Sequence, residues 1–385
     1  MSLTRRHLLA ASAALLPIPA LAADPILAGV SGPLTGPNAQ YGAQWKRGFD
    51  LALDETNGAE INGAGGVNRR SIAYVFEDSQ SDPRQSITIA QKFVSDPRII
   101  MELGDFSSPA SMAASPIYQR AKLTQFGFTN SHPDFTKGGD YMWSNSPSQA
   151  DEQPRLAAFA VQKLGVQRPA ILHLNTDWGR TSKDVFVKAA AGLGAEVAGT
   201  EGYLPTDQDF RPALVRLRDT RPDALILLSY YADAALVARQ ARDLGLRQII
   251  VASTSIYSPK FLELAGPAAN GVFTMASFFP SEPRPEVQRF VAAYRAKYQQ
   301  DPDTFSAIAY DTMILFAALA RQYGATREGV HNGLLHIKDV PSVIYGKVTF
   351  DPTTRRAQAA TYKFLTVRDN AFTIWDGVKP AHAAL

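Results

Sequence analysis

Short apolar runs alternate with amphipathic stretches along most of the chain. The apolar runs are predicted strands and cover residues 26–30, 71–76, 99–104, 124–128, 169–173, 195–199, 224–228, 249–252 and 271–275. Between them, apolar positions follow a helical period over residues 43–57, 84–95, 109–121, 151–164, 178–192, 210–219, 232–244 and 259–265. Short buried strands that alternate with longer helices are typical of βαβ units and of parallel sheets covered on both faces. The pattern therefore predicts an α/β fold.

The pattern changes after Pro280. Residues 285–299, 304–323 and 326–336 are predicted helices, residues 345–350 and 361–366 are predicted strands, and the tail from Lys379 is predicted to be loose. The chain has 385 residues, which is more than one hydrophobic core usually supports. We therefore expect two lobes.

The first 23 residues have the pattern of a secretory signal peptide. A charged start with Arg5 and Arg6 precedes the apolar run 8–16, and a small-x-small site predicts cleavage after Ala22 or Ala23. The paired arginines fit either a twin-arginine signal or a general secretion signal, so the export route stays open. No cysteine follows, so a lipid-anchored N-terminus is not expected. The sequence predicts an exported, periplasmic protein.

Charge and composition narrow the possible partners. Without Arg5 and Arg6 the formal charge falls from +3 to +1, which favours neither nucleic acid nor an anionic membrane as a partner. The chain has no cysteine, so packing alone must stabilise it. No segment after the signal is expected to be long and apolar enough to cross a membrane, so no stable membrane insertion is predicted.

Catalytic signatures do not occur in the sequence. It contains no His-Glu-x-x-His motif, no Gly-x-Ser-x-Gly motif and no cysteine nucleophile. His132 and His173 are interpreted as hydrogen-bonding residues rather than metal ligands. We therefore expect neither an enzyme nor a bound metal or cofactor.

Three loops that follow predicted strands are candidates for a ligand site, because ligands of open α/β sheets bind beyond the carboxyl ends of the strands. They are residues 31–42, 104–111 and 129–136. The first lacks the Lys-Ser/Thr pair of a phosphate-binding loop. In the second, Ser108 precedes Pro109 at a helix start, where free amides suit an anion. Spacing alone leaves open whether Ser108 binds a ligand or only caps its own helix.

Six stretches along the chain resemble those of a known family. They are "GPLTGPNAQYG", "GGVNRRSIAYVFEDSQSDP", "GDFSSPASMAASPIYQRA", "LNTDWG", "YYADAALVARQARDLGL" and "AYDTMILFAALA". In this order and spacing they resemble the type I periplasmic binding proteins of ABC importers, the leucine/isoleucine/valine-binding family. The resemblance covers nearly the whole mature chain. It implies two doubly wound, Rossmann-like lobes joined by a three-segment hinge.

The resemblance also implies roles for individual residues. Ser108 matches a serine that binds the ligand carboxylate, and Ser131 with Thr129 lies in the polar loop that assists it. Tyr41, Trp178 and Tyr230 match aromatic residues around the ligand. The predicted ligand-binding residues are Tyr41, Phe106, Ser107, Ser108, Thr129, Asn130, Ser131, Trp178, Tyr230, Thr254 and Tyr257.

One departure from the family bears on the ligand. Amino-acid binders of this family have a glutamate that pairs with the ligand ammonium, and this chain has Thr254 at that position. No acid lies near Thr254 in the sequence, although Asp105 or Asp233 could substitute. A buried ammonium without a carboxylate partner is unfavourable. Together with the many aromatic rings, to which Phe278 could add, this favours an aromatic or keto acid without an ammonium group.

The predicted organisation and partners follow from the resemblance. Residues 24–146 with 277–345 are expected to form lobe 1, and residues 147–276 with 346–378 lobe 2, followed by a loose tail at 379–385. The ligand would close the two lobes, and the closed form of a monomer would dock on the permease subunits of an importer. An amino-acid ligand and a role as the sensing partner of a membrane receptor remain the alternatives.

Overall fold

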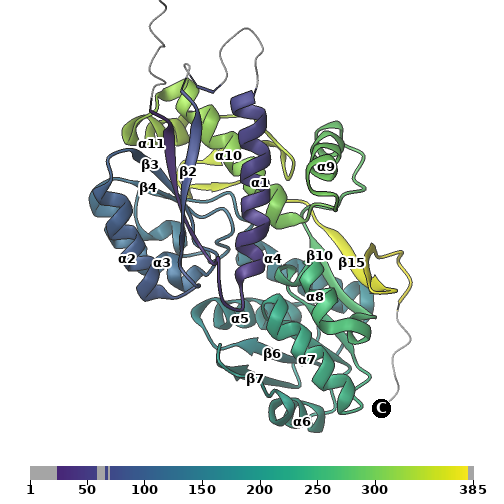
Figure 1. Ribbon diagram of the computed structural model, residues 1–385. Helices are drawn as coiled ribbons and strands as arrows, with labels where there is room; N and C mark the ends of the chain where they lie inside the picture. The colour runs from purple at the N-terminus through teal and green to yellow at the C-terminus, as the bar shows by residue number, and fades with distance from the viewer. Residues whose placement is uncertain (1–23, 59–65, 68–69, 380–385) are drawn as a thin grey trace, which may run out of the picture.

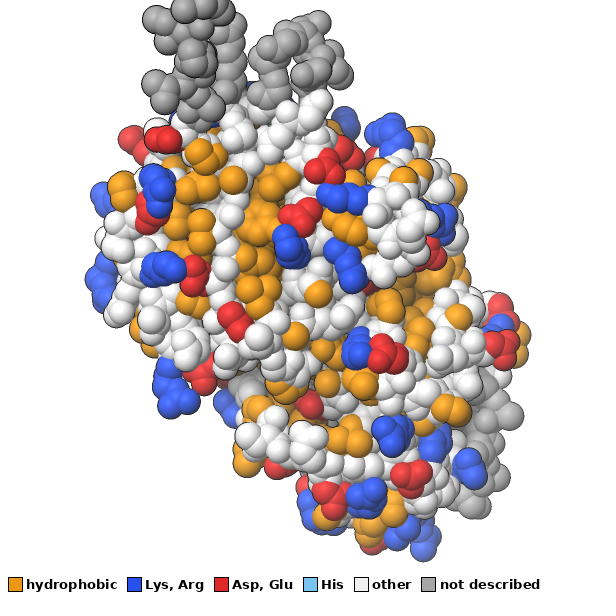
Figure 2. Space-filling view, in the orientation of Figure 1, with side chains coloured by type: hydrophobic (Ala, Val, Ile, Leu, Met, Phe, Trp, Pro, Cys, Tyr) orange, Lys and Arg blue, Asp and Glu red, His pale blue; other side chains and the backbone are white. Residues whose placement is uncertain are grey.

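The computed structural model describes residues 24–58, 66–67 and 70–379, so the predicted signal peptide and residues 380–385 lie outside the described residues. Two α/β lobes lie one above the other in Figure 1. Each lobe contains its own sheet with helices on both faces, so the predicted fold class is confirmed. Lys, Arg, Asp and Glu side chains are interspersed over the visible face in Figure 2, as expected for a formal charge near zero.

The first lobe is built on a parallel sheet with strand order β2-β1-β3-β4-β5. Its strands are β1 (Ile26–Gly32), β2 (Ile72–Asp78), β3 (Ile99–Gly104), β4 (Thr124–Phe126) and β5 (Met142–Trp143). Its helices are α1 (Ala39–Gly58), α2 (Pro83–Ser95), α3 (Ser108–Ala121), α9 (Pro285–Tyr298), α10 (Thr304–Tyr323) and α11 (Arg327–His336), with a short helical turn η1 (Phe135–Gly138). Strands β1 and β3 are buried throughout, because helices cover both faces.

The second lobe is built on a sheet with strand order β16-β15-β10-β9-β8-β6-β7. Its strands are β6 (Pro169–Leu174), β7 (Gly199–Tyr203), β8 (Ala224–Leu228), β9 (Ile249–Ala252), β10 (Val272–Ala276), β15 (Lys363–Arg368) and β16 (Ala371–Ile374), and its helices are α4 (Gln149–Ala158), η2 (Phe159–Leu164), α5 (Asp177–Gly192), α6 (Arg211–Asp219), α7 (Tyr231–Asp243), η3 (Thr254–Ile256), α8 (Pro259–Ala265) and η4 (Gly266–Ala269). The pairs from β7 to β10 are parallel, whereas β15 and β16 add two antiparallel strands at one edge.

The chain passes between the two sheets at residues 144–148, 277–284 and 358–362. The third crossing was predicted near residue 345, and the structure places it at residues 358–362 instead. Two small hairpins, β11 (Val340–Ser342) with β12 (Gly346–Val348) and β13 (Phe350–Asp351) with β14 (Arg356–Ala357), precede it. Phe350 packs against Phe126 and Trp143 at centroid distances of 5.8 and 6.0 Å. These contacts bury Phe350 in the first lobe, so residues 346–357 stay with that lobe.

Two further predictions are corrected by burial. The strand predicted at residues 195–199 lies further along the chain, at β7. The apolar residues Ala195 and Val197, which suggested a strand, instead pack in the core of the second lobe. Strand β7 is an edge strand in which exposed residues alternate with less exposed ones, so it lacks a continuous apolar run. Helix α10 is apolar enough, by length and composition, to cross a membrane, contrary to the prediction that no such segment follows the signal. In the structure 72% of its most apolar window is buried, and its strongest packing partner is α1.

The close packing of α1 on α10 depends on Gly48. A Cβ atom on Gly48 would lie 2.9 Å from the Ala309 Cβ atom and would also collide with the Ser306 carbonyl oxygen. We expect Gly48→Ala to lower the free energy of unfolding by about 1–3 kcal/mol, because the two helices would have to separate. Gly192→Ala is the matched control, since nothing lies within 4 Å of its added Cβ atom. The control should leave stability unchanged or raise it by about 0.5 kcal/mol. Urea unfolding of both variants checks the difference, and equal effects would contradict this account of the interface.

Candidate functional site

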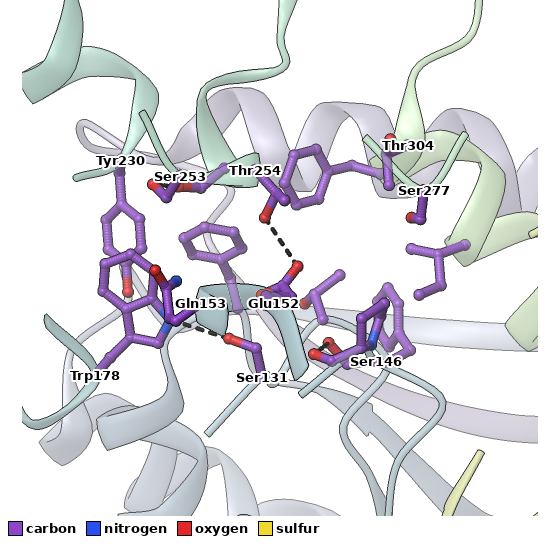
Figure 3. A pocket seen from close by; sticks show the side chains of 17 residues that line it. Ser131, Ser146, Glu152, Gln153, Trp178, Tyr230, Ser253, Thr254, Ser277 and Thr304 are labelled. Atoms are coloured by element: carbon purple, nitrogen blue, oxygen red, sulfur yellow. Dashed lines mark hydrogen bonds between the residues drawn. The ribbon is translucent and has the colours of Figure 1, made fainter. Parts of the chain in front are cut away.

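A cavity with an empty volume of about 650 Å³, part of it open to solvent, lies between the two lobes. Its lining comes from both lobes and from the segments that cross between them (Figure 3). The lining residues are Phe106, Phe128, Thr129, Ser131, Ser146, Pro147, Glu152, Gln153, Trp178, Tyr230, Ser253, Thr254, Ser255, Ser277, Thr304, Phe305 and Ile308. The cavity thus lies beyond the carboxyl ends of strands in both sheets, where open α/β folds bind ligands.

Aromatic rings form much of the apolar wall. The Phe106 and Tyr230 rings meet edge to face with their centroids 4.9 Å apart. The Trp178 ring also contacts Tyr230, with a centroid distance of 4.9 Å. Phe305 contacts Phe106 at 6.0 Å. The rings come from both lobes, so the wall is complete only when the lobes meet. Such a wall suits the apolar body of a small ligand.

Helix N-termini from both lobes border the same cavity. Lining residues occupy the N-cap position of α7 (Tyr230) and the first turns of α4 (Glu152), α5 (Trp178) and α10 (Thr304). Phe106 lies just before the first turn of α3. Each N-terminus carries partial positive charge from the helix dipole and from amides without intrahelical partners. The backbone therefore favours a negative group in the cavity, although no Lys, Arg or His among the described residues lines it.

Hydroxyl groups provide the polar contacts of the lining. The Trp178 Nε1–H donates to Ser131 Oγ across 3.0 Å, so the Ser131 hydroxyl proton remains free to donate to a ligand. Thr129 Oγ1 and Thr304 Oγ1 are buried and have no hydrogen-bond partner in the described part of the chain. Buried polar atoms are normally paired, so these hydroxyls mark positions for ligand oxygens.

Within the part of the chain that the structure describes, Glu152 is the only acidic side chain of the lining, and the sequence did not reveal it. It is 8% exposed, and its Oε1 atom accepts a hydrogen bond from Thr254 Oγ1 at 3.0 Å (Figure 3). Burial raises the pKa of Glu152 to about 7. The expectation that no acid lies near Thr254 was therefore wrong, because α4 brings a residue distant in sequence to the same wall. Neither Asp105 nor Asp233, the two substitutes considered, lines the cavity.

Six of the predicted residues line the cavity, namely Phe106, Thr129, Ser131, Trp178, Tyr230 and Thr254, and five do not, namely Tyr41, Ser107, Ser108, Asn130 and Tyr257. Glu152 and Gln153 could have been predicted from the sequence, because Ser148 marks the start of a helix directly after the first crossing between the lobes. Phe128, Phe305 and Ile308 look like ordinary core positions in the sequence, and nothing distinguished them.

The start of α3 differs from the prediction. Ser107 is the N-cap residue of α3 and Ser108 its first residue, and both are buried outside the lining. The fully buried Asp105 carboxylate accepts the Ser107 N–H at 3.4 Å and the Ser86 hydroxyl at 2.8 Å. The chain's own acid therefore occupies one of the donors that were expected to bind the ligand carboxylate.

Three further candidates for the ligand site make contacts within the protein instead. The Tyr257 ring packs on Phe279 and Phe372 in the second lobe, at 6.0 and 5.0 Å. Asn130 turns its side-chain oxygen to the His132 N–H at 3.3 Å. Phe278 is fully buried against Phe290, so it belongs to the core rather than to the cavity.

Tyr41 joins the two lobes instead of lining the cavity. Its ring stacks behind Phe106 with centroids 3.8 Å apart. Its hydroxyl donates to the Ser255 carbonyl oxygen at 2.8 Å and accepts the Tyr231 N–H at 3.2 Å. Both partners belong to the second lobe, and Tyr41 is fully buried. The Tyr41 hydroxyl therefore links the lobes only in their closed arrangement.

Comparison with known proteins agrees with this fold and site. The family model described as "Periplasmic binding protein" matches residues 25–371. The Leu/Ile/Val-binding protein homolog 2 of Brucella abortus is 30% identical over 299 residues, which cover 77% of this chain and 78% of the relative. A two-lobed α/β protein with a cavity between its lobes has the architecture of a ligand-binding protein. The chain belongs to the periplasmic binding protein family.

Two solved structures show how far the likeness extends. A putative branched-chain amino acid ABC transporter protein from Rhodospirillum rubrum is 34% identical, with a TM-score of 0.66 over 91% of this chain and 100% of that chain. A solute binding protein of an ABC transporter from R. palustris, solved with 4-hydroxybenzoate, is 22% identical, with a TM-score of 0.81 over 91% of this chain and 96% of that chain. The second likeness shows the fold alone.

The link made by Tyr41 can be tested by removing its hydroxyl. Tyr41→Phe leaves the Ser255 carbonyl and the Tyr231 amide without their partner in the closed form, which should cost about 1–2 kcal/mol of closure. We expect a larger radius of gyration by small-angle X-ray scattering and about tenfold weaker ligand binding. Tyr118→Phe is the control, because the Tyr118 hydroxyl is buried in the first lobe and has no partner in the described chain. Identical scattering of the two variants would contradict the role of Tyr41.

Proposed function

We propose that this protein is the exported solute-binding component of an ABC importer. We further propose that it encloses a small organic acid with an aromatic or otherwise apolar body. Family membership and the names of its relatives support the transport role. The predicted signal peptide supports export, and docking of the closed form on permease subunits completes the proposal. The sequence and the described structure supply no enzymatic motif that would suggest another activity.

The observation that carries the ligand class is a ring-lined cavity that has hydroxyl groups and helix N-termini and, in the described ranges of the chain, no cationic side chain. Partial positive charges and hydroxyl donors suit a single carboxylate, which would meet Ser131 and Thr129. The rings of Phe106, Trp178 and Tyr230 suit a flat apolar body. An aromatic or keto acid satisfies both requirements.

An amino acid is the second candidate, and Glu152 is the observation that favours it. An ionised Glu152 could pair with a ligand ammonium in place of the glutamate that Thr254 replaces. The Leu/Ile/Val-binding relatives support this alternative. The two candidates differ in the charge that meets Glu152.

Calorimetric titration with benzoate, benzoylformate, leucine and phenylalanine tests the proposal. We expect benzoate or benzoylformate to bind with a 1:1 stoichiometry and the amino acids to bind more weakly. Tight binding of leucine alone, with both acids inert, would contradict the favoured ligand class. Deletion of the gene should abolish uptake of the bound acid, and normal uptake would contradict the transport role.

The carboxylate contact can be tested at Ser131. Ser131→Ala removes a hydroxyl donor and leaves the Trp178 N–H without its acceptor, so binding of the acid should weaken about tenfold. Ser95→Ala is the control, because this hydroxyl lies exposed at the end of α2 in the same lobe. Unchanged affinity of Ser131→Ala would place the carboxylate elsewhere in the cavity.

A further inference from the structure

Glu152 lies in the binding cavity with a fixed hydrogen-bond geometry. Thr254 Oγ1 donates to its Oε1 atom at 3.0 Å, and the Tyr362 hydroxyl lies 3.4 Å from the same atom. No hydrogen bond joins the Oε2 atom to any described residue, although Glu152 lines the cavity. One oxygen is thus held by the protein, and the other is available to a ligand (Figure 3).

Charged groups around Glu152 do not neutralise it. Asp151, its neighbour on α4, adds negative charge and raises its pKa. Arg155 is exposed and lies over the Tyr362 ring, 5.8 Å from the centroid. Arg356 of β14 donates to the His132 carbonyl and, at 3.4 Å, to the Ser146 carbonyl. No ion pair to Glu152 occurs among the described residues.

The remaining ionisable groups near Glu152 are tyrosines. Tyr345 and Tyr362 face it from the loop after β11 and the segment before β15, and Tyr230 lines the same cavity at the N-terminus of α7. Burial raises the pKa of all three phenols, so they stay neutral at physiological pH. Glu152 is therefore the group in this wall whose charge can change when a ligand enters.

A ligand carboxylate and an ionised Glu152 would share one cavity without a cation between them. Two carboxyl groups at such a site cannot both remain ionised without a large cost in free energy, so one of them takes up a proton. Glu152 is the better proton acceptor, because burial already raises its pKa to about 7, whereas an aromatic acid has its ordinary low pKa in water. A neutral Glu152 could then donate its Oε2–H to a ligand oxygen while Oε1 still accepts from Thr254.

We propose that Glu152 is a specificity-determining residue that binds the ligand as a neutral carboxylic acid, so that an organic acid that binds at alkaline pH does so with uptake of one proton from solvent. This inference rests on the proposed function, because it requires a ligand with a carboxylate and no ammonium group. An ammonium-bearing ligand would have the opposite effect and would keep Glu152 ionised.

Binding should therefore depend on pH in a defined direction. Below about pH 7, Glu152 is already protonated and the affinity is constant. Above it, the free protein must take up a proton to bind, and the Kd should rise about tenfold per pH unit. For benzoate or benzoylformate we expect about 100-fold weaker binding at pH 9 than at pH 6. Calorimetry at pH 8.5 in buffers of different ionisation enthalpy should show uptake of close to one proton per ligand.

Two variants separate this role from a purely structural one. Glu152→Gln is permanently neutral and keeps a donor and an acceptor, so it should bind benzoate as wild type does at pH 6. At pH 9 it should bind about 100-fold more tightly than wild type, because its affinity no longer depends on pH. Asp151→Asn is the control, because it removes the neighbouring exposed acid but keeps Glu152. Its Kd for benzoate should still rise about tenfold per pH unit at alkaline pH, as in wild type.

Three outcomes would overturn the inference. Benzoate binding with no proton uptake and no pH dependence in wild type would show that Glu152 stays in one charge state. A loss of acid binding by Glu152→Gln at pH 6 would show that a neutral side chain with a donor and an acceptor is not what binds the ligand at this position. If neither acid binds to wild type or Glu152→Gln at any pH while leucine binds with proton release, the proposed ligand class fails, and this inference fails with it.

Discussion

Among the described residues no cationic side chain lines the cavity between the lobes, so helix dipoles and uncharged hydrogen-bond donors must hold an anion there. The rest of the arrangement follows from that constraint. Strands of both sheets end at the cavity, and the helices that follow them begin there, with the positive ends of their dipoles at its border. Dipoles are effective only where water is excluded, so the site requires a second wall. The second lobe supplies this wall with Trp178 and Tyr230.

Closure of the lobes and occupancy of the cavity therefore depend on each other. The Tyr41 hydroxyl makes two hydrogen bonds between the lobes and the Trp178 indole makes one, and all three are lost if the lobes separate. Single hydrogen bonds contribute little net free energy, so the closed form needs the further contacts that a ligand makes with both walls. A binding protein for an importer requires this reversibility, because it must close on its solute and then release it.

The sequence predicts the α/β architecture well, because buried parallel strands and amphipathic helices leave strong periodic signals. It predicts edge strands poorly, as β7 shows, since a half-exposed strand lacks a continuous apolar run. The roles of the aromatic residues could not be predicted in full. Tyr41 and Tyr257 have the same residue type as Tyr230, and only the packing decides that Tyr41 stands behind Phe106 and that Tyr257 lies in the core.

Glu152 shows most clearly what sequence proximity misses. The neighbours of Thr254 along the chain include no acid, whereas Glu152 lies 102 positions away and reaches Thr254 through a hydrogen bond at the cavity wall. The Asp105 carboxylate shows the reverse case, in which a residue beside a predicted anion site occupies a donor at that site. Both cases depend on side-chain directions that a motif does not encode.

The position and class of the ligand can be tested with a crystal structure of the protein bound to the solute that co-purifies from its native cells. We expect one small organic acid between the lobes, with its carboxylate within hydrogen-bond distance of Ser131 Oγ and its apolar body against Trp178 and Tyr230. A solute without an acidic group, or one bound to the outer surface of a single lobe, would contradict it.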